Sequence, residues 1–474
     1  MTNIMRTLCR YILSGLVTVL GATACTLDIP YENQLSDPSA ITTVTTAREL
    51  LASAYDRLPN PEFDLSVLGD DFSTTSLISR NSDLGNLYKW QTQPLTDLAL
   101  TLWQGYYESI AIANAVLERT PAIVPQNDSE QAQLNAVNAE AKALKAYCYF
   151  DLLRIFAPDI AEGGSRDGVI LKEEFELGFL ARSSIDACIT HIRTLLTEAV
   201  EVENSPETVY WISQQGVRCL LAEVELYAGE YEKAAQWARL VLETAGGYDV
   251  FAETNYLRLW SGDAGPESLF SRHTTMPFYL DLRYDTEKGD FLEVAETLAS
   301  SYAEADVRGS ESIYPKEFPG ETVGQMITMR CLGKYNRMNW DATEITCIHK
   351  LRTAMACFVL AEACCLAGDR DDEARTAINE YLTRRKAPTL DESLAGDDLL
   401  RAILAEKQRE FVGEGERWFD LKHYRHDILS SWNQGNSDKR IDASDYRWTL
   451  PIPQEEYFYN ENVTQNEGWP KIEN

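Results

Sequence analysis

Apolar residues recur at three- and four-residue steps over four long blocks of this chain, and this pattern constrains its fold more than any other feature. The blocks cover roughly 44–58 with 99–119, 130–157, 184–201 with 209–243, and 348–384 with 397–425. Such spacing places apolar side chains on one face of an amphipathic helix. The two stretches of about 59–98 and 244–347, named here the first and second insertion, have poor periodicity and many turn residues. The sequence therefore predicts a mainly α fold that carries two long irregular insertions.

Two of the helical blocks resemble each other. Leu221-Ala222-Glu223 is followed by Ala228-Gly229, and Leu360-Ala361-Glu362 is followed by Ala367-Gly368. In both, small residues let two antiparallel helices approach closely around a turn that contains glycine. This arrangement is typical of tetratricopeptide-like helix hairpins, and an unrelated all-α bundle is the alternative.

The N-terminus has the layout of a secretory signal. Arg6 and Arg10 precede a mostly apolar, uncharged run over residues 11–21, and Ala22-Thr23-Ala24 lies directly before Cys25. The apolar run is too short to cross a bilayer stably. We expect a lipoprotein signal peptide over residues 1–24, with Cys25 as the acylated (palmitate-bearing) first residue of the mature protein. An ordinary signal peptidase site is the alternative. Residues 25–40 are then a lipidated tether, and the rest folds in water.

The charge of the chain excludes two classes of partner. Residues 1–24 hold two of the 43 basic residues and none of the 74 acidic ones, so the mature chain carries 41 minus 74, or −33. Nucleic-acid binding and flat binding to an anionic membrane both need basic surfaces. The hydrophobic content of 45% indicates a globular protein. Because no Pro/Gly/Ser-rich linker follows residue 40, a single domain over 41–474 is expected.

Eight cysteines remain after Cys9 of the signal and Cys25, and they show no CxxC or Cys/His metal spacing. Cys331 and Cys347 lie in irregular sequence and could pair in an oxidising compartment. The other six lie in helix-like segments, where a cysteine behaves as a small hydrophobic residue. Buried thiols are expected for most of them.

Other chemical motifs are weak. His423 and His426 have helical i, i+3 spacing, but no further ligands lie near them in the sequence, so solvent-facing histidines are expected and no metal site. No G-x-S-x-G elbow or phosphate-binding loop is present. With 74 acidic residues, a carboxylate pair of the glycosidase type could be drawn almost anywhere and carries no weight. No cofactor is expected. Asp70-Asp71 leaves calcium binding open.

The strongest local motif covers residues 403–421, named here the signature segment. An apolar helix face ends at Gly413 and Gly415, and a short helix then resumes. The charged residues across this turn can form an ion-pair network: Glu406, Arg409, Glu410, Arg417 and Asp420. We interpret the network as a fold-locking element; a catalytic role of these acids and arginines is the alternative.

The segment EKQREFVGEGERWFDL (406–421), the PIP sequence (451–453) and the terminal QNEGW (465–469) resemble the C-terminal signature of the SusD/RagB family of Gram-negative outer-membrane lipoproteins. Further matches follow in the expected order from about residue 45 to 470: Trp103, Tyr107, Ile110 and Asn114; Ala139–Leu152; Glu267–Phe270; Tyr302 with Asp306 and Arg308; and Lys334-Tyr335.

Three positions depart from the family pattern. Lys145, Lys407 and His423 stand where the resemblance leads us to expect arginine. Lysine lacks the planar fork that binds a carboxylate bidentately, so we expect the local packing to differ from the family pattern here, while the expected fold is unaffected.

The resemblance implies a fold and a role. The fold is a scaffold of four tetratricopeptide-like hairpins, on which the insertions form the ligand face. The role is to bind a nutrient, most simply an oligosaccharide, at the cell exterior and to deliver it to a SusC-type TonB-dependent outer-membrane transporter, with no chemistry of its own. A periplasmic tetratricopeptide scaffold and a surface glycosidase are the alternatives, and a peptide ligand remains open.

Sugar rings have an apolar face and a polar rim, so aromatic side chains beside amides and acids suit them. The residues in the two insertions that we expect to bind ligand are Asp71, Tyr88, Trp90, Trp260, Tyr279 and Tyr284. Burial in the core is the alternative for each aromatic residue. If both tryptophans bind ligand, alanine at Trp90 and Trp260 should weaken glycan binding and leave the melting temperature nearly unchanged.

Overall fold

The computed structural model describes residues 41–75, 83–175, 178–260, 264–273, 292–320, 322–335, 347–430 and 439–471. Cys25, Tyr279 and Tyr284 lie outside these residues. Ile41–Asn474 form one compact unit, separate from Met1–Ala40. In the part of the chain that is described, no helix has the length and apolarity needed to span a membrane.

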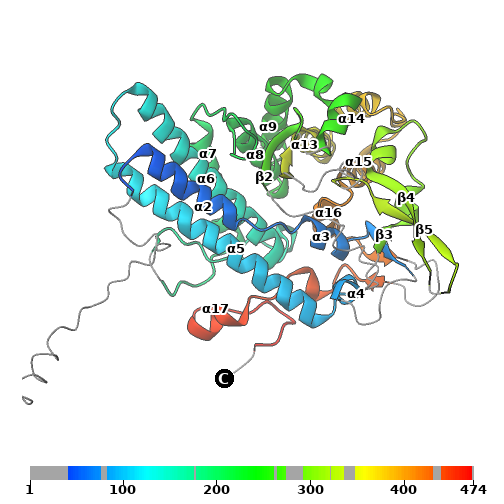
Figure 1. Cartoon of the computed structure of the whole chain (residues 1–474), viewed down its shortest axis with the longest axis horizontal. Helices are drawn as coiled ribbons and strands as arrows, with labels where there is room; N and C mark the ends of the chain where they lie inside the picture. Colours follow the sequence, from blue (N-terminus) through cyan, green and yellow to red (C-terminus); the bar gives the residue numbers. More distant parts are fainter. Residues whose placement is uncertain are drawn as a thin grey trace, which may run out of the picture. The chain divides into compact units, whose positions relative to one another are not determined.

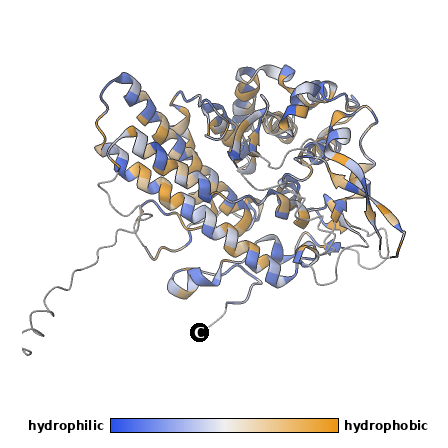
Figure 2. Ribbon diagram, viewed as in Figure 1, coloured by the Kyte–Doolittle hydropathy of each residue, from blue (hydrophilic) through white to orange (hydrophobic). Residues whose placement is uncertain are grey.

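Four helices of the N-terminal half pack side by side (Figure 1): α2 (Val44–Arg57), α5 (Thr92–Arg119), α6 (Asp128–Phe156) and α7 (Ile185–Val200). Three of them begin at a capping side chain. Thr43 forms a capping box with Thr46, and Asn127 and Ser184 each accept a backbone N–H three residues on. Hydrophobic and hydrophilic residues are mixed along these helices (Figure 2), and α6 is buried on nearly all sides over its C-terminal half.

Two helix hairpins follow the pattern that the sequence predicts. They are α8 (Gln214–Tyr227) with α9 (Tyr231–Thr244), and α13 (Thr353–Leu366) with α14 (Asp371–Arg384). Gly229 and Gly368 form the turns with φ of +75° and +87°, which glycine adopts at little cost. Helix α13 also contacts α9, α8 and α15 (Gly396–Phe411), and all of its residues except Leu366 are buried. The mainly α prediction is confirmed, and the hairpins are compatible with a tetratricopeptide-like scaffold. We call α2, α5–α9 and α13–α15 the helical frame.

The signature segment forms α15 (Gly396–Phe411) and α16 (Glu416–His423), joined by a tight turn. Gly413 and Gly415 have φ of +78° and +86°. A Cβ on Gly413 would lie 2.5 Å from Cδ2 of Leu332, and one on Gly415 would lie 3.1 Å from Cα of Glu62. Both glycines are therefore required by conformation and by close approach.

The insertions supply short elements. The first contains α3 (Glu62–Leu68), β1 (Phe72–Thr74) and α4 (Asp83–Tyr88). The second contains η4 (Gly247–Phe251), α10 (Glu253–Leu259), β2 (Ser268–His273), β3 (Leu292–Val294), α11 (Glu296–Ala299), α12 (Val307–Ser312), β4 (Ile313–Pro319) and β5 (Met326–Leu332). The remaining elements are β6 (Cys347–Arg352), β7 (Ile428–Ser430), β8 (Lys439–Ile441), α17 (Gln454–Tyr459) and the 3-10 turns η2 (Thr120–Ala122), η3 (Ile160–Glu162) and η7 (Tyr446–Trp448).

The described strands form antiparallel pairs, and one pair joins the two insertions. Strand β1 pairs with β3, with Phe72 opposite Val294. The other pairs are β2–β6, β4–β5 and β7–β8. In the β4–β5 hairpin, Pro315 and Pro319 of β4 lie opposite Arg330 and Met326.

The predicted ion-pair network exists, but its partners differ from those expected. Glu410 binds Arg352 (Nη1–Oε1, 2.7 Å) and Tyr381, and Glu406 binds Arg308 (2.7 Å) as well as Arg409. Arg417 binds Asp70 of the first insertion, and Asp420 binds Lys407. Of the five expected residues, Glu406 and Arg409 pair with each other, and the other three pair outside this set, because buried arginines of the second insertion, of β6 and just after α14 face the segment. Burial would raise the pKa of Glu410, but Arg385, Arg352 and other cations outweigh it and lower this pKa to about 2.

Each of the eight cysteines in the described residues is a buried thiol that takes part in no disulfide. The expectation of buried thiols is confirmed, and the possible Cys331–Cys347 disulfide is not formed in this structure. The expectation of two solvent-facing histidines is corrected for His423. Its Nδ1 lies 3.0 Å from Oδ2 of Asp159, and its side chain is only 22% exposed, whereas His426 is exposed. No cluster of three or more metal-binding side chains occurs among the residues described.

Candidate ligand-binding site

A cleft of about 590 Å³ opens where the two insertions meet the signature segment. We call it the insertion cleft. Strand pairing between β1 and β3 brings its walls together, and the N–H of Ala295 donates to the carbonyl of Asp71 (2.9 Å). Its lining residues come from the first insertion, the second insertion, α15 and β7: Asp70 and Ser73; Ala295–Leu298, Ser300 and Ser301; Ala405, Gln408 and Arg409; and Leu429.

Most side chains of the insertion cleft are polar and are held by their neighbours. Gln408 Nε2 donates to Oδ1 of Asp70 (3.0 Å), and Arg417 binds both oxygens of Asp70 (2.7 and 2.9 Å). The hydroxyl of Ser301 donates to the carbonyl of Leu298 (2.7 Å). These contacts fix a wall of hydroxyl, amide, carboxylate and guanidinium groups, with the exposed Leu429 at one side. Such a surface can form hydrogen bonds with a polyhydroxylated ligand.

Asp71, a predicted ligand residue, lies behind this wall. Its side chain is fully buried, and Oδ2 accepts the N–H of Gly413 (3.1 Å). Burial, together with the neighbouring Asp70, raises the pKa of Asp71 to about 7. Through its hydrogen bond with Gly413, the side chain of Asp71 connects the first insertion to the glycine turn of the signature segment.

Tyr88 and Trp90, also predicted ligand residues, are 3% and 1% exposed. The Nε1 of Trp90 donates to the carbonyl of Leu68 (2.9 Å), and its ring centroid lies 4.8 Å from that of Trp448. The Lys439 ammonium lies 4.4 Å from the ring centroid of Tyr88. Neither ring has a face open to a sugar in this conformation.

Trp260 is likewise buried, with no exposed surface. It packs against Tyr335, with ring centroids 5.0 Å apart, and the Lys334 ammonium lies 4.8 Å from its ring centroid. The four described candidates thus lie in the interior. For the three aromatic residues among them, this is the alternative of burial in the core. The other two, Tyr279 and Tyr284, fall outside the described residues.

The insertion cleft depends on residues that sequence reasoning did not select. Thr297, Ser300 and Ser301 carry hydroxyl groups and no aromatic ring, so aromatic content does not point to them, and Gln408 lies inside a helical motif. The only sequence signal for them was their position. Ser300 and Ser301 belong to the second insertion, and Gln408 is in the signature segment.

A second cleft, of about 670 Å³, lies on the helical frame between α2, α6 and residues 204–211. We call it the frame cleft. Its one aromatic wall residue among those described, Trp211, is covered by Arg48, whose guanidinium carbon lies 3.7 Å from the ring centroid. Arg48 is also paired with the buried Glu140 (2.6 Å). One face of this ring is therefore already occupied.

Comparison with known proteins gives two family matches. Residues 28–226 match a model described as SusD-like, starch-binding associating with outer membrane, and residues 334–469 match the model of the SusD family. Two curated relatives from Formosa agariphila are SusD-like protein P38, 22% identical with 85% of this chain and 88% of the relative covered, and SusD-like protein P2, 23% identical with 85% of each covered.

Solved structures share the fold. A SusD superfamily protein from Bacteroides vulgatus superposes with a TM-score of 0.76 at 24% identity, covering 91% of this chain and all of that one. A SusD-like carbohydrate binding protein from the same organism gives 0.77 at 18% identity, covering 89% and 97%. A SusD superfamily protein from Bacteroides thetaiotaomicron gives 0.74 at 23% identity, covering 90% and 100%.

Proposed function

Because the chain belongs to the SusD/RagB family, we propose that it is a cell-surface lipoprotein that binds a nutrient, most simply an oligosaccharide, and passes it to a SusC-type TonB-dependent transporter of the outer membrane. The observation that carries this proposal is the insertion cleft. Its volume of about 590 Å³ lies within the usual range for ligand pockets, and its walls are rich in hydrogen-bonding groups.

The ligand that suits this cleft is a neutral glycan. Hydroxyls of Thr297, Ser300 and Ser301 line it beside the Gln408 amide. The chain carries a formal charge of −31, so polyanions would be repelled. One structural neighbour is named a carbohydrate binding protein, and the N-terminal family model is described as starch-binding. Both agree with a glycan ligand.

We propose binding without catalysis. Two acids of the described residues line the cleft, Asp70 and Glu296, and glycoside hydrolysis uses a pair of available carboxyl groups. Asp70 has both oxygens bound by Arg417. A carboxylate committed in this way is a poor proton donor and a poor nucleophile. The protein would present the ligand to its partner unchanged.

The experiment is a glycan-array screen of the soluble protein without residues 1–25, followed by calorimetric titration of the best glycan. Thr297→Trp fills the insertion cleft from an exposed position, and we expect it to weaken binding at least about tenfold. Thr45→Trp, also exposed, fills the frame cleft and is the matched control. Loss of binding only in Thr45→Trp would move the site to the frame cleft. Hydrolysis of the glycan would favour a glycosidase.

A further inference from the structure

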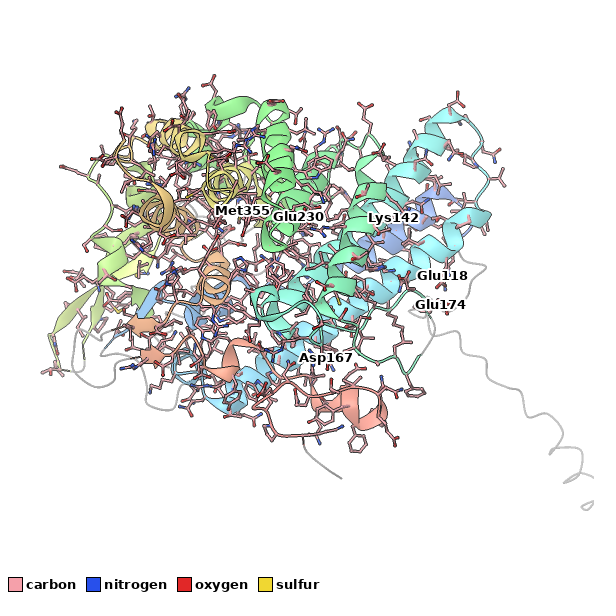
Figure 3. All side chains as sticks on the ribbon, turned by 180° about the vertical axis from the view of Figure 1, so that it is seen from behind. Glu118, Lys142, Asp167, Glu174, Glu230 and Met355 are labelled. Atoms are coloured by element: carbon pink, nitrogen blue, oxygen red, sulfur yellow. The ribbon has the colours of Figure 1, made fainter. Side chains whose placement is uncertain are left out.

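A third cleft, of about 330 Å³, is formed by parts of the chain that lie far apart in the sequence. We call it the C-terminal cleft. Its lining residues come from four stretches of the chain: 158–166, 422–425, 443–449 and 466–468. Figure 3 labels Asp167, which directly follows the lining residue Arg166. The C-terminal cleft shares no lining residue with the insertion cleft or the frame cleft, so it is a separate feature of the molecule.

Buried side chains hold the walls of the C-terminal cleft in place. Lys422 is 7% exposed, and its Nζ donates to two backbone carbonyls at the end of α6 (2.6 and 2.8 Å). Asn466 is 6% exposed, and its Nδ2 donates to the carbonyls of Phe156 and Leu450 (2.9 and 2.7 Å). These hydrogen bonds connect α16 and the C-terminal segment to α6. The cleft is therefore formed without a ligand, as binding pockets usually are.

Tyr446 gives the cleft an aromatic ring that is fixed and still partly exposed. The residue is 43% exposed, and its ring packs edge-to-face against Trp469 with the ring centroids 5.3 Å apart. Gly468 makes this position possible, because a Cβ there would overlap Cγ of Tyr446. A ring that is held in this way loses little conformational freedom when the apolar face of a sugar packs against it.

Arg425 lines the cleft directly after α16, in an unusual backbone conformation. Its φ is +54°, at a position where glycine most often ends a helix. Its side chain is 51% exposed. Its one ion-pair partner among the described residues, Glu162, is 3.8 Å from Nη1, beyond the distance of a hydrogen bond. The guanidinium therefore has donors for a ligand, and the arginine stands where glycine would fit the backbone better.

The charged side chains that line the C-terminal cleft balance one another. There are three cationic and three acidic residues: Arg166, Lys422 and Arg425; Glu162, Asp445 and Glu467. The hydroxyls of Ser444 and Thr449 lie on the same walls. The cleft thus combines hydrogen-bond donors and acceptors without a net formal charge, in a chain of charge −31. Such a surface suits a neutral ligand with many hydroxyls.

We propose that the C-terminal cleft is a second carbohydrate-binding site, which takes a neutral mono- or disaccharide unit. The sugar ring packs against Tyr446, while its hydroxyls accept from Arg425 and donate to Glu467. The volume lies at the lower end of the range for ligand pockets and below that of the insertion cleft, which limits the ligand to a short unit. The site goes beyond the proposed function, because the two clefts are built from different residues and each can bind without the other.

The test is saturation-transfer NMR titration with maltose, cellobiose, lactose and xylobiose. The soluble protein without residues 1–25 carries Thr297→Trp, so that the insertion cleft is filled. We expect at least one of these sugars to bind this protein with a Kd of about 1 mM or below. Adding Arg425→Gly should weaken that binding at least about tenfold and leave the melting temperature unchanged or higher, because glycine suits the left-handed backbone. Ser444→Trp, at an exposed lining position, should also block binding.

Lys386→Gly is the matched control. Lys386 is also an exposed cation on a left-handed backbone, with φ of +57°, and it lines none of the three clefts. Its glycine variant should keep the Kd within about twofold.

Three results would overturn the second site: no binding of any of the four sugars to the Thr297→Trp protein, an unchanged Kd in Arg425→Gly, or binding of glucuronate alone. The first of these would leave the insertion cleft as the ligand site. Binding that survives Thr297→Trp and is lost in Arg425→Gly would support the second site even if the insertion cleft held no sugar.

Discussion

The indole of Trp90 is held by contacts from distant parts of the chain. Leu68 accepts its N–H, Trp448 packs against its ring, and Arg447 donates to its backbone carbonyl (2.7 Å). The periodicity of apolar residues depends only on local spacing, so it cannot reveal that Trp448, more than 350 residues away, packs against this ring. An aromatic residue in an irregular segment looks the same in sequence whether it is covered or open. This is why the ligand residues predicted from aromatic content fall in the core.

The burial of Trp90 reverses the expectation for its alanine variant. Trp90→Ala should lower the free energy of unfolding by about 3–5 kcal/mol, because it leaves a large cavity and removes the hydrogen bond to the Leu68 carbonyl. Thermal unfolding measures this loss. Tyr459→Ala, whose side chain is 73% exposed, should leave the melting temperature nearly unchanged. An unchanged melting temperature for Trp90→Ala would contradict the packing role assigned to this residue.

At the scale of elements, the helices of the frame were predictable and the insertions were not. The block predicted over 184–201 is α7 at Ile185–Val200, and the block over 130–157 is α6 at Asp128–Phe156. Helix signals are local, because caps and apolar spacing lie within the element itself. The β1–β3 pair joins residues more than 200 positions apart, and each strand has three residues. Strands this short carry no alternating pattern, so the position of the insertion cleft was not accessible from the sequence.

The turn between α15 and α16 gives a matched pair of glycine substitutions. Gly413→Ala and Gly229→Ala both place a Cβ on a left-handed backbone, with φ of +78° and +75°. A Cβ at Gly413 also lies 2.5 Å from Leu332, whereas one at Gly229 meets nothing within 4 Å. We expect about 1–2 kcal/mol of destabilisation for Gly229→Ala from conformation alone, and clearly more for Gly413→Ala because of the added overlap. Equal losses, measured by urea unfolding, would show that Leu332 moves aside freely.

At the scale of the whole molecule, the proposed role requires attachment through Cys25. We expect Cys25→Ala to abolish incorporation of labelled palmitate and to release the protein from the outer-membrane fraction. Stable anchoring needs two acyl signals, and both are lost with the Cys25 thiol. The acidic domain cannot replace them, because it is not attracted electrostatically to an anionic bilayer. Fractionation of cells that express each form measures this. Ser53→Ala, an exchange far from the N-terminus, is the control.

The prolines of β4 bear on how such molecules behave when they are crowded on a cell. An unpaired strand edge invites a neighbouring copy to add its own strand. Pro315 and Pro319 have no N–H to offer, so an incoming strand would find two rungs of the ladder missing. If the protein is tethered as proposed, crowded copies can therefore collide through this hairpin and separate again without forming an intermolecular sheet.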